Sequence, residues 1–238
     1  MLAAISVDYY VRLEQGRENH PSAQVLEALS HVLQLDDDAR LHLYRVAGLT
    51  PSPTRSPAPE RVDPELWRLL ELWPDSPALV LGRAYDVLAG NRLAYALFDG
   101  FKQGPNLMLK LFLDPDARVF YPDWPQVARY TVAGFRLLQG RNPHDPRIRE
   151  VVDELTRSSP DFVDMWERHE ARAKRLSTKR FNHPEVGEFR LRIHAFDVRS
   201  ASLQELIVYQ AEEGSRGAEA LALLGSLAAT RSQEVAQG

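Results

Sequence analysis

Five prolines fall within residues 50–64, TPSPTRSPAPERVDP, and this segment constrains the fold more than any other part of the chain. Proline lacks a backbone N–H and fixes φ, so a segment this rich in it excludes a helix or a central strand and favours an extended tether. A shorter stretch with a helical pattern precedes it, and a larger part follows. We therefore expect a small N-terminal domain at 1–49, a linker at 50–64 and a larger C-terminal domain at 65–238.

Composition excludes several classes of protein. The formal net charge is −4, so any binding of nucleic acid must depend on a local surface. The absence of cysteine excludes disulfides and cysteine-ligated metal sites, and the 7 histidines show no ligand spacing. The start does not have the pattern of a signal peptide, and no apolar run reaches the roughly 20 residues of a membrane span. We expect a cytoplasmic protein with no membrane segment and no metal site.

Three helices are predicted before the linker. Ser6 is a suitable N-cap for the first helix, and Gly16 ends it. Ser22 begins the second, whose apolar residues recur at helical spacing. Aspartates at 36–38 place negative charge at the start of the third, which leads to Gly48. The N-terminal domain is therefore expected to be all-α.

The larger part mixes helical and strand periodicity. Residues 78–90 suit two short strands, and EFRLRIHAFDV at 188–198 alternates apolar and polar residues as a half-buried antiparallel strand does. Residues 204–212 are the predicted neighbour of that strand. The fold class is therefore α+β, with one antiparallel sheet covered by helices. Those helices are expected at 62–73, 91–101, 107–113, 114–120, 125–139, 146–157, 160–174 and 215–230.

The opening segment AISVDYYVRLEQGRENHPS has a capping serine, an apolar residue four positions later, a Leu-Glu-x-Gly ending and a following Pro-Ser pair. In this pattern it resembles the second half of a helix-turn-helix of the Xre class, which implies that its first helix recognises DNA. The alternative is an ordinary amphipathic helix of an all-α subdomain. The matching positions are Ser6, Tyr10, Leu13, Glu14, Gly16, Pro21 and Ser22.

The side chains of this helix divide into a packing face and a face for DNA. Tyr10 and Leu13 are three apart and share the face that can pack on a core. Arg12 suits a guanine, and Tyr9 suits a thymine methyl group. Backbone N–H groups at the helix start suit phosphate contacts. The predicted residues for a double-stranded operator are Ser6, Val7, Asp8, Tyr9, Arg12 and Arg17.

Two observations weigh against strong binding of DNA. Residues 1–48 carry seven acidic and four basic side chains, a local charge of −3 that is poor for a phosphate-binding surface. Domains of this class place two helices before the recognition helix, whereas only MLAAI precedes Ser6. We therefore expect a partial helix-turn-helix without the first helix that should cover Tyr10, Leu13 and Leu29. This chain alone is expected to bind DNA weakly or not at all.

Several motifs after the linker match one family in the same order. They are LGRAYDVLAGNRLAYALF at 81–98, NLMLKLFLDPDARVFYPDW at 106–124, MWERHEARAKR at 165–175, KRFNHPEVGEF at 179–189 and VYQAEEGS at 208–215. They resemble the ligand-binding domain of the MmyB-like group, which follows an Xre-type helix-turn-helix. The resemblance implies a PAS-like fold, a role in transcription regulation and a pocket for an acyl chain such as a fatty acid.

The chain departs from the pattern of this group in two places. Gly90 stands where the group usually has Trp, and Glu170-Ala171 stands where it usually has Asp-Val. Loss of the Trp side chain leaves a gap that a neighbour must fill, or else enlarges the pocket.

An acyl ligand needs an apolar tunnel with a few convergent polar groups. His169 and Arg172 lie three apart on the helix face of Trp166, so they are predicted to bind a carboxylate head group. Tyr85, Asn91 and His183 are further candidates. The alternative for the aromatic residues is a solid core. The candidates for the tunnel wall are Phe98, Leu107, Leu111, Phe112, Phe135, Leu138, Phe162 and Trp166.

Motifs of catalysis are absent from the sequence. His169-Glu170 lacks the second histidine of a zinc helix, and GSRG at 214–217 lacks the pattern of a nucleophile elbow. We expect that the protein is not an enzyme. We also expect it to hold no cofactor other than a bound fatty acid or similar acyl ligand. The interpretation is a ligand-responsive, DNA-binding transcriptional regulator that acts as a homodimer. The alternatives are a sensor that acts by protein–protein contact without DNA binding of its own, and an enzyme, which would require turnover of a bound compound.

Overall fold

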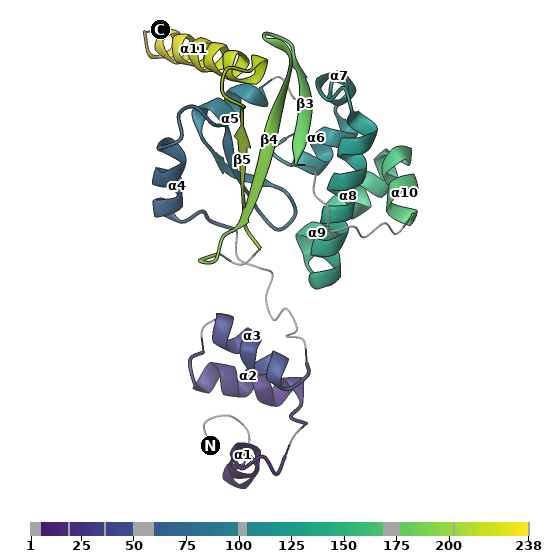
Figure 1. The fold of residues 1–238 in the computed structure, drawn as a ribbon. Coiled ribbons are helices and arrows are strands. Elements are labelled where there is room, and N and C mark those ends of the chain that lie inside the picture. The colour runs from purple at the N-terminus through teal and green to yellow at the C-terminus, as the bar shows by residue number, and fades with distance from the viewer. Residues whose placement is uncertain are drawn as a thin grey trace. The chain divides into compact units, whose positions relative to one another are not determined.

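The structure, a computed structural model, describes residues 6–18, 20–35, 37–49, 60–99, 104–168, 177–201 and 203–237. The chain forms two compact units, Met1–Ser56 and Pro57–Gly238. Within the described residues the fold is α+β, as the two periodicities predict (Figure 1).

The N-terminal unit contains α1 (Val7–Glu14), α2 (Ala23–Val32) and α3 (Asp37–Val46). Ser6 and Ser22 cap the first two helices by accepting hydrogen bonds from the backbone N–H groups of Tyr9 and Val25. Gly16 adopts a φ of +67°, which ends α1 as predicted.

The small core of this unit lies between α2 and α3. Leu26, Leu29 and Tyr44 are buried there, and the Tyr44 hydroxyl lies 2.9 Å from the Glu27 carboxylate. The expectation that Leu29 lacks cover is therefore wrong, because its side chain is only 5% exposed. In contrast, α1 has no buried residue.

The C-terminal unit is built on a five-stranded sheet. Its strands are β1 (Ala78–Leu81), β2 (Val87–Gly90), β3 (Thr178–His183), β4 (Gly187–Asp197) and β5 (Glu205–Gln210). They lie in the order β2-β1-β5-β4-β3, and every neighbouring pair is antiparallel. This is the PAS-like antiparallel sheet that the resemblance implies.

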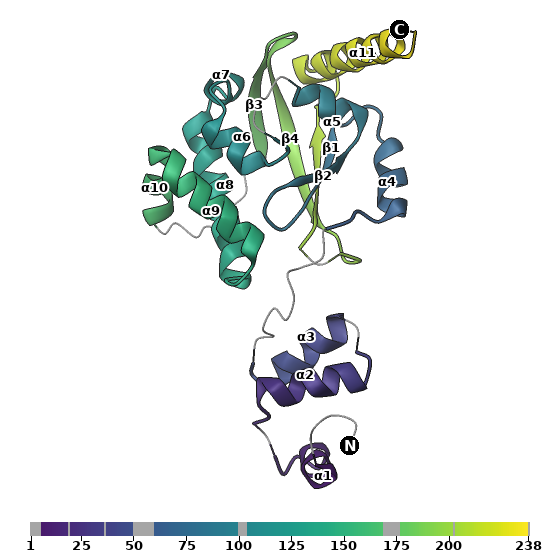
Figure 2. The ribbon, with the colours of Figure 1, turned by 180° about the vertical axis from the view of Figure 1, so that it is seen from behind.

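Helices cover the sheet unequally. α4 (Pro64–Glu71) lies beside the β2 side, and the group of α6 to α10 lies beyond β3 (Figures 1 and 2). Leu70 of α4 packs with Val80 and Leu206 on one face of the sheet. The opposite face carries Leu191 and Tyr209 into the main core. The remaining helices are α5 (Arg92–Leu97), α6 (Leu107–Leu113), α7 (Ala117–Phe120), α8 (Trp124–Arg141), α9 (Pro146–Ser158), α10 (Pro160–Glu167) and α11 (Arg216–Gln237).

The third strand is the element that the sequence analysis did not predict. Lys179, Phe181 and His183 alternate toward the core face, paired with Leu191, Phe189 and Gly187 of β4. Two of these three inward residues are polar, so the apolar alternation that indicates a half-buried strand is missing. The predicted helices at 62–73, 91–101 and 114–120 are shorter in the structure, the one at 215–230 is longer, and residues 169–174 of the helix predicted at 160–174 lie outside the described residues.

Gly90 does not contribute to a larger pocket. A Cβ atom at this position would lie 2.7 Å from Leu79 Cδ2 and 3.4 Å from the Tyr95 ring. Leu79 and Tyr95 therefore fill the space that a Trp side chain would take, and the loss of this Trp does not enlarge the pocket.

Two glycines of α11 allow a matched test of close packing. A Cβ at Gly217 would lie 2.6 Å from the backbone oxygen of Arg190, whereas a Cβ at Gly225 would lie 3.8 Å from Leu93 Cδ1. We expect Gly217→Ala to lower the free energy of unfolding by about 1–3 kcal/mol through overpacking. Gly225→Ala should raise it by up to about 1 kcal/mol, because alanine favours the helix. Urea unfolding of both variants checks the opposite signs; equal effects would contradict the packing of α11 on β4.

Candidate functional site: a cavity on the helix-covered face of the sheet

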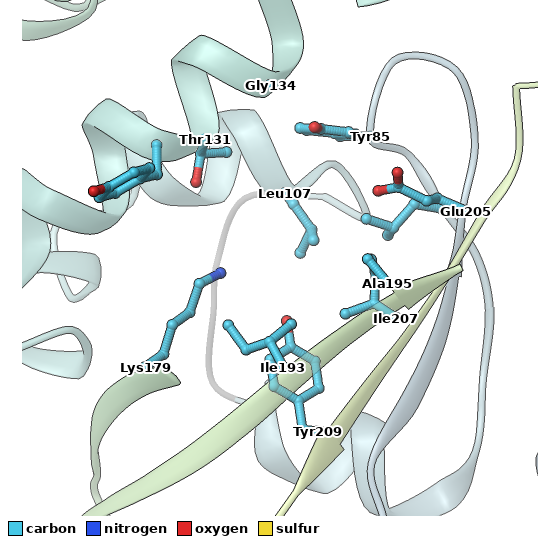
Figure 3. Close-up of a pocket in the computed structure, with 12 residues that line it drawn as sticks. Tyr85, Leu107, Thr131, Gly134, Lys179, Ile193, Ala195, Glu205, Ile207 and Tyr209 are labelled. Atoms are coloured by element: carbon cyan, nitrogen blue, oxygen red, sulfur yellow. The ribbon is translucent and has the colours of Figure 1, made fainter. Parts of the chain in front are cut away.

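The C-terminal unit holds a cavity of about 110 Å³ between the sheet and the helices α6 and α8 (Figure 3). Strands β4 and β5 form its floor, α8 forms one wall, and the hairpin between β1 and β2 forms another. Most of its lining is apolar. The lining residues are Leu81, Tyr85, Leu107, Tyr130, Thr131, Gly134, Lys179, Ile193, Ala195, Glu205, Ile207 and Tyr209.

Lys179 is the only lysine or arginine among these lining residues, and its amino group points into the cavity (Figure 3). It comes from β3 and lies 5.9 Å from the centre of the Tyr121 ring. Within the described part of the chain, its amino group has no hydrogen bond and no ion pair. Burial lowers the pKa of Lys179 from 10.5 to about 8. A cation with no anionic partner in an apolar cavity is suited to bind an anion.

A second polar group faces the cavity near this lysine. The hydroxyl of Tyr209 on β5 points toward the interior and makes no hydrogen bond to a described residue (Figure 3). Burial raises the pKa of Tyr209 well above its ordinary value, so the hydroxyl remains a donor. Together with Lys179 it supplies donors for a carboxylate.

Glu205 lies on the other side of the cavity from Lys179 (Figure 3). Its negative charge disfavours an anionic group at that end. The electrostatics therefore give the cavity a direction, with the anionic end of a ligand near Lys179 and the uncharged end toward Tyr85.

Tyr85 and Leu107 are the two sequence candidates that line this cavity. The aromatic residues predicted for the tunnel wall do not line this cavity; they are Phe98, Phe112, Phe135, Phe162 and Trp166. Phe112 packs against Trp124 and Phe162, with ring centres 5.6 and 5.4 Å away. Phe135 lies behind Tyr85, at 5.4 Å, and Trp166 stacks on Phe162 at 5.2 Å.

The other wall candidates also lie in the core. Phe98 contacts the Tyr209 ring at 5.5 Å. Leu111 belongs to the main core of the sheet. Leu138 packs against a second buried cluster, which contains Val132, Phe135 and Phe162.

Two of the polar candidates already have backbone partners. The Asn91 side chain caps α5 and also bonds the backbone of Ala78, Trp73 and Ser76. His183 is buried, with Nε2 3.2 Å from the Ala96 carbonyl and Nδ1 accepting from the Glu185 N–H. Burial lowers the pKa of His183, which favours the neutral ring. His169 and Arg172 lie outside the described residues.

Lys179 was not among the predicted site residues, because it lies in β3, a strand that no local pattern predicted. The only local signal of the strand is Phe181, the one apolar residue of TKRFNH at 178–183. Only the register with β4, in which Lys179 pairs with Leu191, places this lysine on the inner face.

In the N-terminal unit, the predicted DNA-reading face of α1 is open. Val7 is 79% exposed, and Asp8, Arg12 and Arg17 are also exposed, while Tyr9 is half-buried. The Ser6 hydroxyl accepts from the Tyr9 N–H at 3.2 Å, so it acts first as the helix cap. The arrangement leaves these side chains accessible for contact with a partner.

An antiparallel sheet with a mostly apolar cavity between it and its covering helices is an arrangement that can hold a small molecule. Residues 62–224 match the family described as the MmyB-like transcription regulator ligand binding domain. Because the match spans more than half of the chain, the protein belongs to this family. No curated protein matches the chain closely enough to count as a relative.

This is a family of transcription regulators and not an enzyme family. Among the described residues, no helix combines the length and apolar character needed to cross a membrane. The same residues contain no cluster of His, Asp or Glu that could hold a metal ion.

Proposed function

We propose that the protein is a DNA-binding transcription regulator controlled by an amphiphilic ligand with a carboxylate head, such as a fatty acid. The observation that carries the proposal is the Lys179 amino group, which points into a mostly apolar cavity and has no hydrogen bond or ion pair with a described residue. The ion pair with Lys179 and a hydrogen bond from Tyr209 would fix the head, and the apolar wall would exclude water from the chain. The family match supports the role in ligand-responsive regulation.

The proposed mechanism is a shift between conformations. Ligand that binds one conformation of the sensor better than another raises the population of that conformation. In a homodimer, this shift would change how two α1 helices meet a two-fold operator. Light scattering of the full chain tests the dimer, and a monomer at all concentrations, with and without operator, would contradict this mechanism.

Ligand and operator need separate experiments. Native mass spectrometry of the purified full chain, followed by lipid extraction, should release a carboxylate amphiphile. For DNA, selection from random duplexes followed by a gel shift should yield a preferred sequence, and Arg12→Ala should weaken binding to it. Arg45→Ala is the control, because Arg45 lies on α3, outside the predicted reading helix. If no duplex is selected although ligand binds, the DNA-binding part of the proposal is wrong.

The acidic character of the N-terminal unit favours a second candidate function. Residues 1–48 carry seven acidic and four basic side chains, and α1 has no buried residue. A sensor that acts by protein–protein contact, without DNA binding of its own, is consistent with both observations. Ligand binding without selection of any DNA sequence would favour this second function.

A further inference from the structure

The hairpin between β1 and β2 has one residue in the wall of the cavity. Tyr85 lies in this hairpin and adopts a φ of +61°, a left-handed conformation that is costly for a residue with a side chain. A Cβ added to Gly134 of α8 would lie 2.8 Å from the Tyr85 hydroxyl. The tyrosine therefore fits against α8 only because residue 134 is glycine. Tyr85 is one of the residues that a ligand filling the cavity would contact.

The other side of the same hairpin holds Glu60, a residue of the proline-rich segment 50–64. The Glu60 carboxylate accepts a hydrogen bond from the Arg83 N–H at 3.1 Å. A Cβ at Gly82 would lie 2.5 Å from Glu60 Oε2, so the carboxylate occupies the space that this glycine leaves. The Arg83 side chain then lies 3.5 Å from Glu60 and 3.2 Å from Asp145.

These contacts are shielded from water. The side chains of Glu60, Arg83 and Asp145 are 12%, 15% and 9% exposed. The neighbouring Arg61 carbonyl accepts a hydrogen bond from Gln204 Nε2 at 3.0 Å. Residues 60 and 61 of the linker are therefore fixed to the sensor domain.

One end of the hairpin is anchored independently of Glu60. Asp86 accepts two hydrogen bonds from Arg147, at 2.7 and 2.9 Å, and one from Asn106 at 2.9 Å. With Asp86 held, we expect a displacement of Tyr85 to move Gly82 and Arg83 and not Asp86. Those two residues are the ones that hold Glu60.

We infer that the hairpin 82–86 is a relay that transmits occupancy of the cavity to residues 60–61, which belong to the proline-rich linker that precedes the sensor domain. The inference rests on the proposed function for its biological trigger, and its geometry comes from the contacts of Tyr85 and Glu60. The left-handed backbone of Tyr85 is costly, so a ligand that contacts Tyr85 would favour any hairpin conformation in which this cost is released.

The relay can be tested without a ligand, because Gly134→Ala pushes on Tyr85 from inside the cavity. Gly140→Ala is the matched control: it lies on the same helix, and a Cβ there meets no atom within 4 Å. Amide hydrogen exchange of residues 60–63 is measured in the full chain for both variants. We expect Gly134→Ala to change the exchange rates by about fivefold or more, and Gly140→Ala to leave them unchanged.

Gly134→Ala and Gly140→Ala are then each combined with Glu60→Ala. As a control, they are also combined with Glu65→Ala, because the Glu65 side chain is 76% exposed. The effect of Gly134→Ala should disappear with Glu60→Ala and persist with Glu65→Ala. Equal exchange in Gly134→Ala and Gly140→Ala would overturn the relay, as would an effect that survives Glu60→Ala.

A second experiment uses decanoate to test whether ligand binding in the cavity changes residues 60–63. Its binding is measured by calorimetry and its effect on residues 60–63 by exchange. Binding of decanoate to the wild type without a change at 60–63 would overturn the relay and leave the proposed ligand class intact. Failure of decanoate to bind, together with a response to Gly134→Ala, would overturn the ligand class and support the relay.

Discussion

Lys179→Met is expected to weaken the binding of decanoate about 10- to 100-fold, the effect of losing one charge-assisted hydrogen bond in a shielded site. Methionine keeps most of the length of the side chain, so the shape of the cavity should change little. Lys110→Met is the control, because Lys110 is also half-buried but does not line the cavity. Calorimetry at pH 7 measures both affinities, and an unchanged affinity in Lys179→Met would contradict the assigned head-group site.

The pH dependence of binding should follow the same lysine. Since burial lowers the pKa of Lys179 to about 8, the free protein loses this charge as the pH rises through that value. The affinity of the wild type for decanoate should therefore fall between pH 7 and pH 10 toward the affinity of Lys179→Met. The variant itself should show no such fall.

As the pH rises, the free energy of unfolding should change in the opposite direction to the affinity for decanoate. The folded protein holds the Lys179 proton less tightly than the unfolded chain, whose lysine keeps a pKa near 10.5. The unfolded chain therefore binds more protons between about pH 8 and 10.5, and Lys179 makes the free energy of unfolding rise with pH across this window. At pH 7 the buried charge opposes folding, so Lys179→Met should raise the midpoint of thermal unfolding while it weakens ligand binding.

The second large effect is expected at the anchor of the hairpin. Asp86→Ala removes the carboxylate that Arg147 binds through two hydrogen bonds, and it leaves a part-buried arginine and Asn106 without this partner. We expect the free energy of unfolding to fall by about 2–4 kcal/mol. Urea unfolding with both circular dichroism and fluorescence detection measures the change.

The control for Asp86 is an ion pair of similar length on the surface. Arg118 and Asp161 lie 2.6 Å apart, with side chains 57% and 50% exposed. Asp161→Ala should cost only about 0–1 kcal/mol, because solvent screens an exposed pair. A loss from Asp86→Ala no larger than that from Asp161→Ala would contradict the anchoring role.

Lowering the pH should remove the contribution of the Asp86 carboxylate to the free energy of unfolding. Burial raises the pKa of Asp86, but the hydrogen bonds from Arg147 and Asn106 outweigh it and hold the pKa below its ordinary value of 3.8. The stabilisation from this carboxylate is therefore present above pH 3.8 and is lost as the pH falls through its lowered pKa.

Much of the fold could be predicted from local patterns, because the signals for these elements are short-range. Ser6, Ser22 and Asn91 each cap a helix where the sequence places one. The alternation of 188–198 produced β4 within one residue. The fold class followed from strands at both ends of the larger domain with helices between them.

The site could be predicted only in part, because it depends on pairing between distant segments. Tyr85 and Leu107 were identified from apolar and polar character near the matched motifs. Lys179 reaches the cavity through the register of β3 with β4, which no local pattern reveals when two inward residues are polar. Aromatic side chains such as Phe112 look the same in sequence whether they line a cavity or fill a core, and here Phe112 packs between Trp124 and Phe162.

The central claim is that the cavity selects a carboxylate through Lys179, and the most direct test compares two ligands that differ only in the head group. Calorimetry of the wild type with decanoate and with decanol should give at least about tenfold tighter binding of decanoate at pH 7. The preference should vanish in Lys179→Met. Equal affinity of the wild type for the two ligands, or a preference that survives the substitution, would contradict the account.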